Sequence, residues 1–490
     1  MIDKKSIYPI ANGVIAQYKN QEVKEYEGNP LIEALPDIIR KDQLIRCLAN
    51  YPSLSEEELS MEGFLRAHLI ERVYSFFQPL PIHIELEERV SRMLRQGYVW
   101  RNPFSKETVE KYYEINESME GRDITYVTDN PSILPSVNSL SVIGVSGMGK
   151  SISVSKILNN YPQVIIHFDY KDIKYSQYQL VYLIVNTPHD GSIKGLCLDI
   201  ISKFDQYLGT DYYRKVVNYS AVNKLLPMIC QIARRTSLGL LVIDEIQVIS
   251  KAKSGGKEQI LDFFLTLVNS IGVPIMLIGT TKAMSMLQSH FRQARRFTGK
   301  GEIIFDRIED YEQIEWALFI KALLRFNANR NGVEDHDGVS KALYFESQGI
   351  FDIAVKIYGM SQIEAINNGS EMVTPELVLQ VAKSKLLTIK PAIEAIQNNN
   401  IGALLEFEDI MPLNYSSGES NCRNKELVKV IDTKTTDQIV REQVMTTKPK
   451  KKVSINELEE NDLRLIVGKG ISQKTSAYNI LLNRGIIKQL

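Results

Sequence analysis

The sequence predicts an α/β fold in which helices flank a parallel sheet. Apolar runs typical of buried strands alternate with helical segments between residues 140 and 278. A glycine-rich loop follows the first of these runs, and a pair of carboxylates follows a later one. Because ligands of parallel sheets bind at the carboxyl ends of the strands, both features fall where a binding site is expected.

The glycine-rich loop has the spacing G-x-x-x-x-G-K-S of a phosphate-binding loop. It consists of Gly144, Val145, Ser146, Gly147, Met148, Gly149, Lys150 and Ser151. Residues 140–143 before it are typical of a strand, and residues 152–158 after it are typical of a helix start. Inward-pointing N–H groups and the positive end of that helix suit phosphate oxygens. We therefore expect Lys150 to reach the β- and γ-phosphates and Ser151 to bind Mg²⁺.

Two carboxylates, Asp244 and Glu245, follow a second buried-strand run at residues 240–243, about ninety residues after the loop. In phosphate-loop ATPases, one carboxylate at such a strand end holds magnesium through water, and a second polarises the attacking water. We therefore assign Asp244 to the metal and Glu245 to water activation. The expected cofactors are ATP and Mg²⁺.

Two further features extend the expected ATP site. Thr280 and Thr281 follow a fourth strand at residues 274–278, where either hydroxyl can orient water between the loop and Glu245. Arg295 and Arg296 come late in the core, where an arginine can act in trans on the γ-phosphate of a neighbouring subunit. A simple strand-end turn and a solvated basic helix end are the alternative interpretations. The sequence does not choose between the two threonines or between the two arginines.

Composition narrows the class of protein. The chain has 490 residues, 44% hydrophobic and 24% charged, which is ordinary for a soluble protein of about two to four domains. Its formal net charge is −1, so any nucleic-acid surface must be local. The four cysteines form no C-x-x-C pair, which argues against a zinc site or a disulfide framework. Without a signal-peptide core or a long apolar run, a cytoplasmic protein with no membrane contact is expected.

Five regions are expected along the chain. Residues 1–125 form a helical N-terminal extension, 126–308 a nucleotide-binding core and 309–400 a helical lid. A polar linker covers 401–452, and residues 453–490 regain the hydrophobic patterning of a docking segment. Helical spacing is found at about 192–207 and 221–235 in the core, and at 312–330 and 339–366 in the lid. Thr374 and Pro375 mark a further helix start.

The loop, the Asp-Glu strand, the threonines, the paired arginines and the helical lid together resemble an AAA+ ATPase. Within that class the chain resembles the TnsC family, the ATP-dependent regulators of heteromeric cut-and-paste transposons. The segments that carry the resemblance are residues 29–36, 77–80, 97–103, 240–247, 254–256, 273–283, 294–296 and 347–356. The similarity spans most of residues 25–390 and returns near 453–487.

This resemblance implies that ATP-bound copies of the chain form rings or filaments around duplex DNA, with hydrolysis controlling assembly and disassembly. It implies a TniQ- or TnsD-type target selector bound by the N-terminal helices. The last segment would meet the TnsA endonuclease or the TnsB transposase. The protein would be cytoplasmic and bacterial, and associated with the nucleoid when on DNA. Lys194, Arg214 and Lys215 lie in the region that matches the DNA-lining pore, and they suit sequence-independent backbone contacts. Solvated surface charge is the alternative interpretation of these three residues.

One lid position departs from the AAA+ pattern. Lys356 stands where many relatives place a sensing arginine, and a lysine lacks the planar fork of arginine. Two other interpretations remain open: a small-molecule phosphotransferase with the same loop, and an AAA+ loader or signalling ATPase unrelated to transposition. The Asp-Glu pair, the distal arginines and the lid argue against the first. The long N-terminal extension and the docking segment argue against the second.

Overall fold

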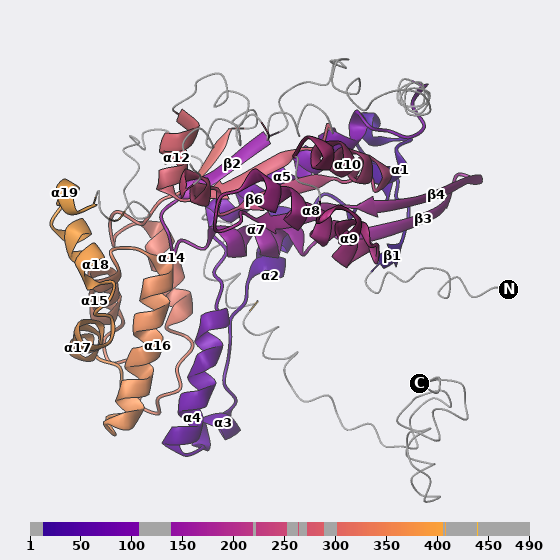
Figure 1. Ribbon diagram of the computed structural model, residues 1–490. Helices are drawn as coiled ribbons and strands as arrows, with labels where there is room; N and C mark the ends of the chain where they lie inside the picture. Colours follow the sequence, from indigo (N-terminus) through magenta and orange to yellow (C-terminus); the bar gives the residue numbers. More distant parts are fainter. Residues whose placement is uncertain are drawn as a thin grey trace, which may run out of the picture. The chain divides into compact units, whose positions relative to one another are not determined.

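The computed structural model of the protein describes residues 13–106, 139–218, 222–251, 272–288 and 301–404, and the single residues 263, 407 and 439. The chain divides into two units, Met1–Thr436 and Asp437–Leu490, and every helix and strand named below belongs to the first (Figure 1). Among the described residues, each helix is too short or too polar to cross a membrane.

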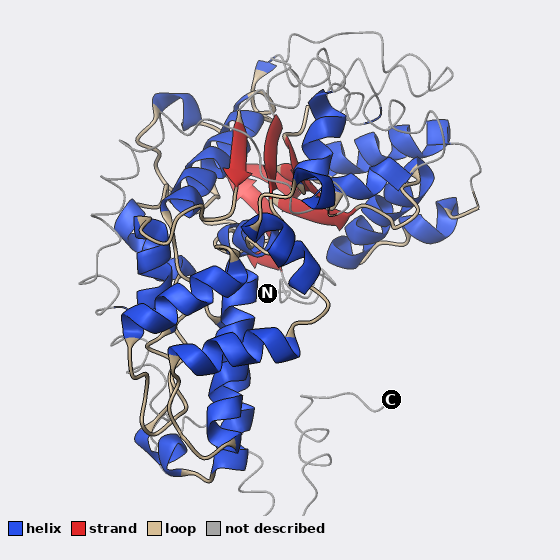
Figure 2. Cartoon of the chain, turned by 90° about the vertical axis from the view of Figure 1, so that its left-hand side faces the viewer, coloured by secondary structure: helices blue, strands red, loops and turns tan. Residues whose placement is uncertain are grey.

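The main sheet has five parallel strands in the order β5-β6-β7-β2-β8. Their bounds are β5 (Tyr182–Asn186), β6 (Leu240–Asp244), β7 (Ile275–Gly279), β2 (Ser139–Gly144) and β8 (Glu302–Phe305). The three central strands β6, β7 and β2 are buried along their whole length, as expected for a parallel sheet covered on both faces. Helices lie on both sides of these strands (Figure 2). The α/β fold class predicted from the sequence is therefore confirmed.

A second sheet of three strands, in the order β1-β3-β4, was not predicted. It consists of β1 (Gly13–Ile15), β3 (Val164–Tyr170) and β4 (Ile173–Leu180). The sequence has apolar runs at 164–168 and 180–185, which fall in β3 and mainly in β5. The polar segment between these runs contains β4, which pairs with β3 as an antiparallel hairpin. Such a hairpin needs only a short turn, whereas a parallel pair would need a crossover of about a dozen residues. The chain passes directly from β4 into β5 of the main sheet.

The helices of the core are α7 (Lys150–Leu158), α8 (Ile193–Leu208), α9 (Tyr212–Val216), α10 (Val222–Arg235) and α12 (Thr281–Gln288), with the 3₁₀ helix η5 (Ile246–Lys251). Three of them, α7, α8 and α10, follow the predicted segments, and the other short helices were not predicted. Apolar side chains of α8 and α10 share one buried core with the strands; Phe204 and Ile229 are examples. The sequence also predicts a helix at 257–271, and this segment lies outside the described residues, apart from Phe263.

The lid is helical, as the sequence predicts, with a second core of its own. Its helices are α14 (Ile314–Leu323), α15 (His336–Ser347), α16 (Phe351–Asn367), α17 (Pro375–Lys385), α18 (Lys390–Gln397) and α19 (Ile401–Leu404). The Thr374 side chain accepts a hydrogen bond from the Leu377 N–H (3.2 Å), so this predicted cap is confirmed. The helical pattern at 339–366 is broken at Gln348 and Gly349, both with positive φ. A Cβ atom at Gly349 would lie 2.1 Å from the Ile308 carbonyl oxygen, so the break also needs a glycine.

The N-terminal extension packs partly on the lid. It contains η2 (Lys24–Tyr26), α1 (Pro30–Glu33), α2 (Lys41–Leu48), α3 (Glu56–Ser60), α4 (Gly63–Leu69), η3 (Ile70–Ser75) and α5 (Pro81–Val99). Ile70 and Val73 belong to the lid core, and α4 and η3 contact α16 (Figure 1). Arg66 of α4 is almost fully buried, and it pairs with Glu371 and donates to the Ala328 carbonyl oxygen. The boundary predicted near residue 125 lies outside the described residues.

Helix α5 instead fastens the extension to the main sheet. The Tyr98 hydroxyl donates to the Ser237 carbonyl oxygen (3.0 Å), just before β6. Arg89 Nη1 donates to the Glu302 carbonyl oxygen of β8 (3.0 Å). The chain therefore crosses from the core to the lid and back before it reaches the phosphate loop. The two crossings are joined by a short antiparallel bridge between Asn50 and Phe77.

At the start of α5, His83 is held neutral by burial. Its Nδ1 accepts the Leu80 N–H (2.8 Å), and its ring packs against Phe77 and Phe305. Burial lowers the pKa of His83 to about 3. An unfolded histidine has a pKa of about 6.5, so below that pH the unfolded chain binds a proton that the folded chain excludes at His83. The contribution of neutral His83 to the stability of the fold is therefore complete above pH ~6.5 and is lost on acidification. We expect His83 to contribute about 2 kcal/mol to the loss of stability between pH 7 and pH 5.

This prediction can be checked by chemical denaturation at both pH values. His83→Asn should show a smaller loss than the wild type, whereas His68→Asn, at an exposed histidine, should show the wild-type loss. Equal losses in all three proteins would mean that the burial of His83 does not govern its protonation.

Candidate nucleotide-binding site

The phosphate loop joins the end of β2 to the start of α7, as predicted. Gly147 and Gly149 have φ of 83° and 82°, a left-handed conformation that favours glycine. At Gly144, a Cβ atom would lie 2.0 Å from the Phe305 carbonyl oxygen of β8. That same oxygen accepts the Val145 N–H (2.9 Å). The loop is therefore shaped by its glycines and held at its start by the neighbouring strand.

Lys150 is folded back across this loop. Its side chain is almost fully buried, and Nζ donates to the carbonyl oxygens of Gly144 (2.9 Å) and Val145 (2.8 Å). Lys150 is also the first residue of α7, whose N-cap, Gly149, provides no side-chain cap. The N–H groups of the first helical turn thus have no intrahelical partners, and Ser151 lies in that turn. The arrangement offers an ammonium group and a helix N-terminus to the same anion.

The two carboxylates lie at the carboxyl end of β6, as predicted. Asp244 is buried, and its Oδ1 accepts the Glu245 N–H (2.7 Å). Its carbonyl oxygen accepts both the N–H and the hydroxyl of Thr187, at 2.9 and 2.8 Å. Glu245 is exposed and has a φ of 60°, a conformation that costs a non-glycine residue about 1–2 kcal/mol. The backbone turn at Glu245 is therefore maintained by its surroundings.

One strand, β7, separates the loop from these carboxylates. Neighbouring strands lie about 4.8 Å apart, so the ends of β2 and β6 are about 10 Å apart, a gap suited to phosphates with a metal ion. Ser151 Oγ and the Asp244 carboxylate are the oxygen donors that Mg²⁺ prefers, with phosphate oxygens completing its shell. Among the described residues, no three His, Cys, Asp or Glu side chains gather as a metal site of their own. The residues fit a magnesium ion that is shared with the nucleotide.

The predicted threonines lie at the end of β7, between the loop and the carboxylates. Thr280 and Thr281 are both buried, and Thr281 is the first residue of α12. The Thr280 N–H donates to Gln247 Oε1 (3.2 Å), and Gln247 Nε2 donates to Glu245 Oε2. Gln247 was missed in the sequence analysis, where its position two residues after Glu245 was the available signal. Arg295 and Arg296 lie outside the described residues, so their role stays a prediction.

The lid touches the phosphate loop directly. The Asp352 N–H at the start of α16 donates to the Gly147 carbonyl oxygen (3.1 Å). A Cβ atom at Gly147 would lie 2.8 Å from Ile350 Cγ2. Lys356, one turn further along α16, pairs with the Asp352 carboxylate (2.6 Å). The lid lysine that departs from the AAA+ pattern is thus bonded to the residue that contacts the loop.

The residues proposed for DNA contact lie on α8 and α9, two helices that pack together. Lys194 is in the first turn of α8 and is partly exposed. Arg214 and Lys215 are exposed in the last turn of α9, and Lys215 Nζ lies 5.6 Å from the centre of the Tyr212 ring. DNA binding by these residues stays a prediction.

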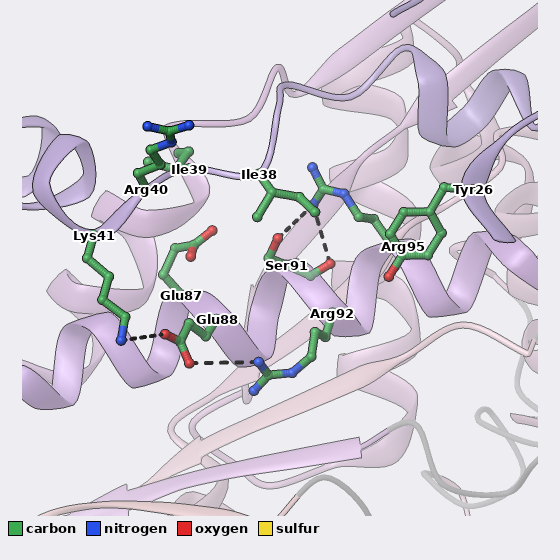
Figure 3. A pocket seen from close by; sticks show the side chains of 10 residues that line it. All are labelled: Tyr26, Ile38, Ile39, Arg40, Lys41, Glu87, Glu88, Ser91, Arg92 and Arg95. Carbon is green, nitrogen blue, oxygen red and sulfur yellow. Dashed lines mark hydrogen bonds and ion pairs between the residues drawn. The ribbon is translucent and has the colours of Figure 1, made fainter. Parts of the chain in front are cut away.

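A separate hollow of about 490 Å³ is lined by residues of 38–41 and of α5 (Figure 3). Lys41 and Arg92, two of its basic side chains, both lie near the Glu88 carboxylate (3.6 and 3.8 Å). Burial raises the pKa of Glu87, which accepts a hydrogen bond from Tyr161 (3.1 Å). None of its lining residues belongs to the phosphate loop or to the strand ends, so it is distinct from the predicted site.

Comparison with known proteins supports the nucleotide-binding core. Residues 136–287 match the family described as "AAA domain". No curated protein matches the chain. Similar solved structures include a Walker-type ATPase of Pyrococcus abyssi, at 12% identity over 68% of this chain and 95% of that one, with a TM-score of 0.37. Another is Cdc6p of Pyrobaculum aerophilum, at 15% identity over 66% and 97%, with a TM-score of 0.35.

A third similar structure, described as Drosophila ORC bound to DNA, has 13% identity over 69% of this chain and 83% of that chain, with a TM-score of 0.31. The family match and the observed strand order agree with the predicted site. The core is an AAA+ phosphate-loop NTPase fold, and ATPase activity in general is the chemistry it supports.

Gly147 has a left-handed backbone in the phosphate loop and also lies against the lid, so its substitution tests this site. Gly147→Ala combines about 1–2 kcal/mol of left-handed backbone strain with a clash against the lid. We therefore expect ATP affinity to fall by about tenfold or more, in a titration with a fluorescent ATP analogue. The matched control is Gly369→Ala, where φ is 74° and a Cβ atom meets nothing within 4 Å. The control should lose stability but keep its affinity; an equal loss of affinity in both variants would contradict the assigned role of Gly147.

Proposed function

We propose that this protein is an ATP-dependent regulator of DNA transposition that assembles on duplex target DNA and links a target selector to the transposase. The observation that carries the proposal is one site: a phosphate loop, a carboxylate pair and a strand-end threonine at one sheet edge, with a lid contacting the loop. The resemblance to the TnsC family then supplies the biological context. AAA+ ATPase chemistry is common to that family and to its alternatives, so assembly and partner binding decide between them.

The residues of the site divide the chemistry among them. Lys150 and the loop N–H groups bind and orient the phosphates, and Ser151 and Asp244 hold the magnesium ion. Bound Mg²⁺ supplies charge neutralisation on the phosphate oxygens. Glu245 accepts a proton from the attacking water at its carboxylate, and the hydroxyl of Thr280 or Thr281 orients that water.

Assembly is proposed to follow from an incomplete site. In the TnsC-like scheme, Arg295 or Arg296 of a neighbouring copy binds the γ-phosphate and compensates its negative charge. ATP is then bound by two subunits at once and holds them together. An arginine supplied in trans accelerates hydrolysis by about 10³–10⁵. Hydrolysis removes the group that both subunits bind, so it loosens the assembly.

The extension offers a route from a target selector to this site. Helices α3 and α4 are the candidate docking surface for a TniQ- or TnsD-type selector, and residues 453–490 are the candidate contact for TnsA or TnsB. Because α4 and η3 contact α16, and α16 contacts Gly147, a partner bound at the extension acts on the same body that touches the loop. We propose that binding of the selector affects the ATP site through these packing contacts.

The proposal is tested by electron microscopy with duplex DNA and a non-hydrolysable ATP analogue, where rings or filaments are expected.

Lys150→Ala should bind no nucleotide and form no assembly, because the loop loses its buried cation. Glu245→Gln should bind ATP normally and accumulate assemblies with ATP itself, because water is no longer activated. A wild-type protein that stays monomeric with nucleotide and DNA would refute the proposed assembly. Assemblies that bind neither TnsA nor TnsB in pull-downs would favour the loader alternative.

The DNA contacts have a separate test. Combined substitution of Lys194, Arg214 and Lys215 by alanine should weaken assembly on DNA uniformly across sequences. Each lost phosphate contact should reduce the magnitude of the slope of log affinity against log salt by about 0.9. The triple variant should therefore show a slope smaller in magnitude by about 3 per subunit. The control replaces the exposed lid lysines Lys321, Lys341 and Lys385 by alanine and should keep the wild-type slope. An unchanged slope in the first variant would move the DNA surface elsewhere.

A further inference from the structure

Gln247 forms a link between the water-activating carboxylate and the end of β7. Its Nε2 donates to Glu245 Oε2, and its Oε1 accepts the Thr280 N–H (3.2 Å). We propose that Gln247 is a positioning residue, which fixes Glu245 and ties its position to the strand end that carries Thr280. The proposal deepens the proposed function, and it rests on that function only in assigning water activation to Glu245.

Glutamine suits this link chemically. The Thr280 N–H requires an acceptor and the Glu245 carboxylate requires a donor, and a side-chain amide supplies both at once. Glutamate at position 247 can still accept from Thr280, but it repels Glu245. Methionine has a similar length and can form neither bond well. Asparagine is one methylene shorter, so it cannot span the same two groups in the same backbone position.

The amide of Gln247 lies against the end of β7. A Cβ atom at Gly279, the last residue of β7, would lie 3.3 Å from Gln247 Oε1. The Thr280 N–H that Gln247 accepts follows directly on this strand, so the sheet fixes the position of the donor.

The position of the Glu245 side chain depends on contacts such as the one with Gln247. It is exposed and follows a buried strand with a left-handed backbone, so packing alone does not fix its flexible side chain. Gln247 holds one carboxylate oxygen, Oε2, and so defines the direction in which Oε1 faces. Because the other end of the link is the backbone of Thr280, a movement of this strand end is transmitted to Glu245. Thr280 and Glu245 thereby act as one unit.

The first test uses nucleotide-free protein, where the link is already present. Gln247→Met and Glu245→Ala each remove it, so in a double-substitution cycle the thermal midpoint of the double variant should lie close to that of the less stable single variant. Additive shifts would overturn the link. Gln206→Met, at an exposed glutamine on α8, is the matched control and should combine additively with Glu245→Ala.

The second test separates positioning from binding. In Gln247→Met, kcat for ATP hydrolysis should fall by about 10²-fold, since a misplaced catalytic group has an effect of that size. The affinity for a fluorescent ATP analogue should stay within about threefold of the wild type, because the phosphate loop is untouched. Gln247→Glu should lose kcat to a similar extent while keeping its acceptor for Thr280. An unchanged kcat in either variant, or a loss of ATP affinity equal to the loss of kcat, would overturn the positioning role.

The two levels of the proposal fail in different ways. If Glu245→Ala still hydrolyses ATP normally, the assignment of Glu245 is wrong and the proposed mechanism fails, whatever the stability cycle gives. If Glu245→Ala is inactive while Gln247→Met is fully active, the mechanism stands and only the positioning role fails.

Discussion

The contact between β8 and the start of the phosphate loop is the constraint on which the site depends. The Phe305 carbonyl oxygen accepts the Val145 N–H and leaves no room for a Cβ atom at Gly144. Because β2 is also paired with β7 on its other side, the start of the loop is fixed from two directions. The left-handed turns at Gly147 and Gly149 then direct the loop into α7. A nucleotide thus meets N–H groups that are already oriented, which reduces the entropy lost on binding.

The same loop is where the core and the lid meet. Asp352 of α16 bonds to Gly147, and α16 also packs against α4 and η3 of the N-terminal extension, a distant part of the sequence. Buried Arg66 of α4 pairs with the partly exposed Glu371, which joins these two parts of the chain. Removal of Glu371 would leave the buried Arg66 charge without its carboxylate partner, which is destabilising. The part of the extension formed by α4 and η3 therefore packs with the lid, and the lid contacts Gly147.

The sequence predicted the local part of this site and missed the parts made by distant residues. The phosphate loop and the Asp244–Glu245 pair are contiguous motifs, so their chemistry is visible without the fold. The bond between Gln247 and Thr280 depends on the pairing of β6 with β7, which no local pattern reports. The packing of Ile70 and Val73 in the lid core is likewise non-local. The β3–β4 hairpin was missed because β4 is largely polar and only its last two residues are buried, so it lacks the apolar run that marks the other strands.

Lys150 explains how the loop keeps its shape before a nucleotide arrives. A buried ammonium group without partners is costly, and here two loop carbonyl oxygens accept its hydrogen bonds. Phosphate oxygens must compete with these carbonyls, so binding exchanges neutral acceptors for charged ones, which form the stronger hydrogen bonds. We expect this exchange to leave the backbone of the loop in place, because only the acceptors of the lysine change. Nucleotide binding at this site is then an electrostatic replacement on a loop that its glycines and the contact with β8 already shape.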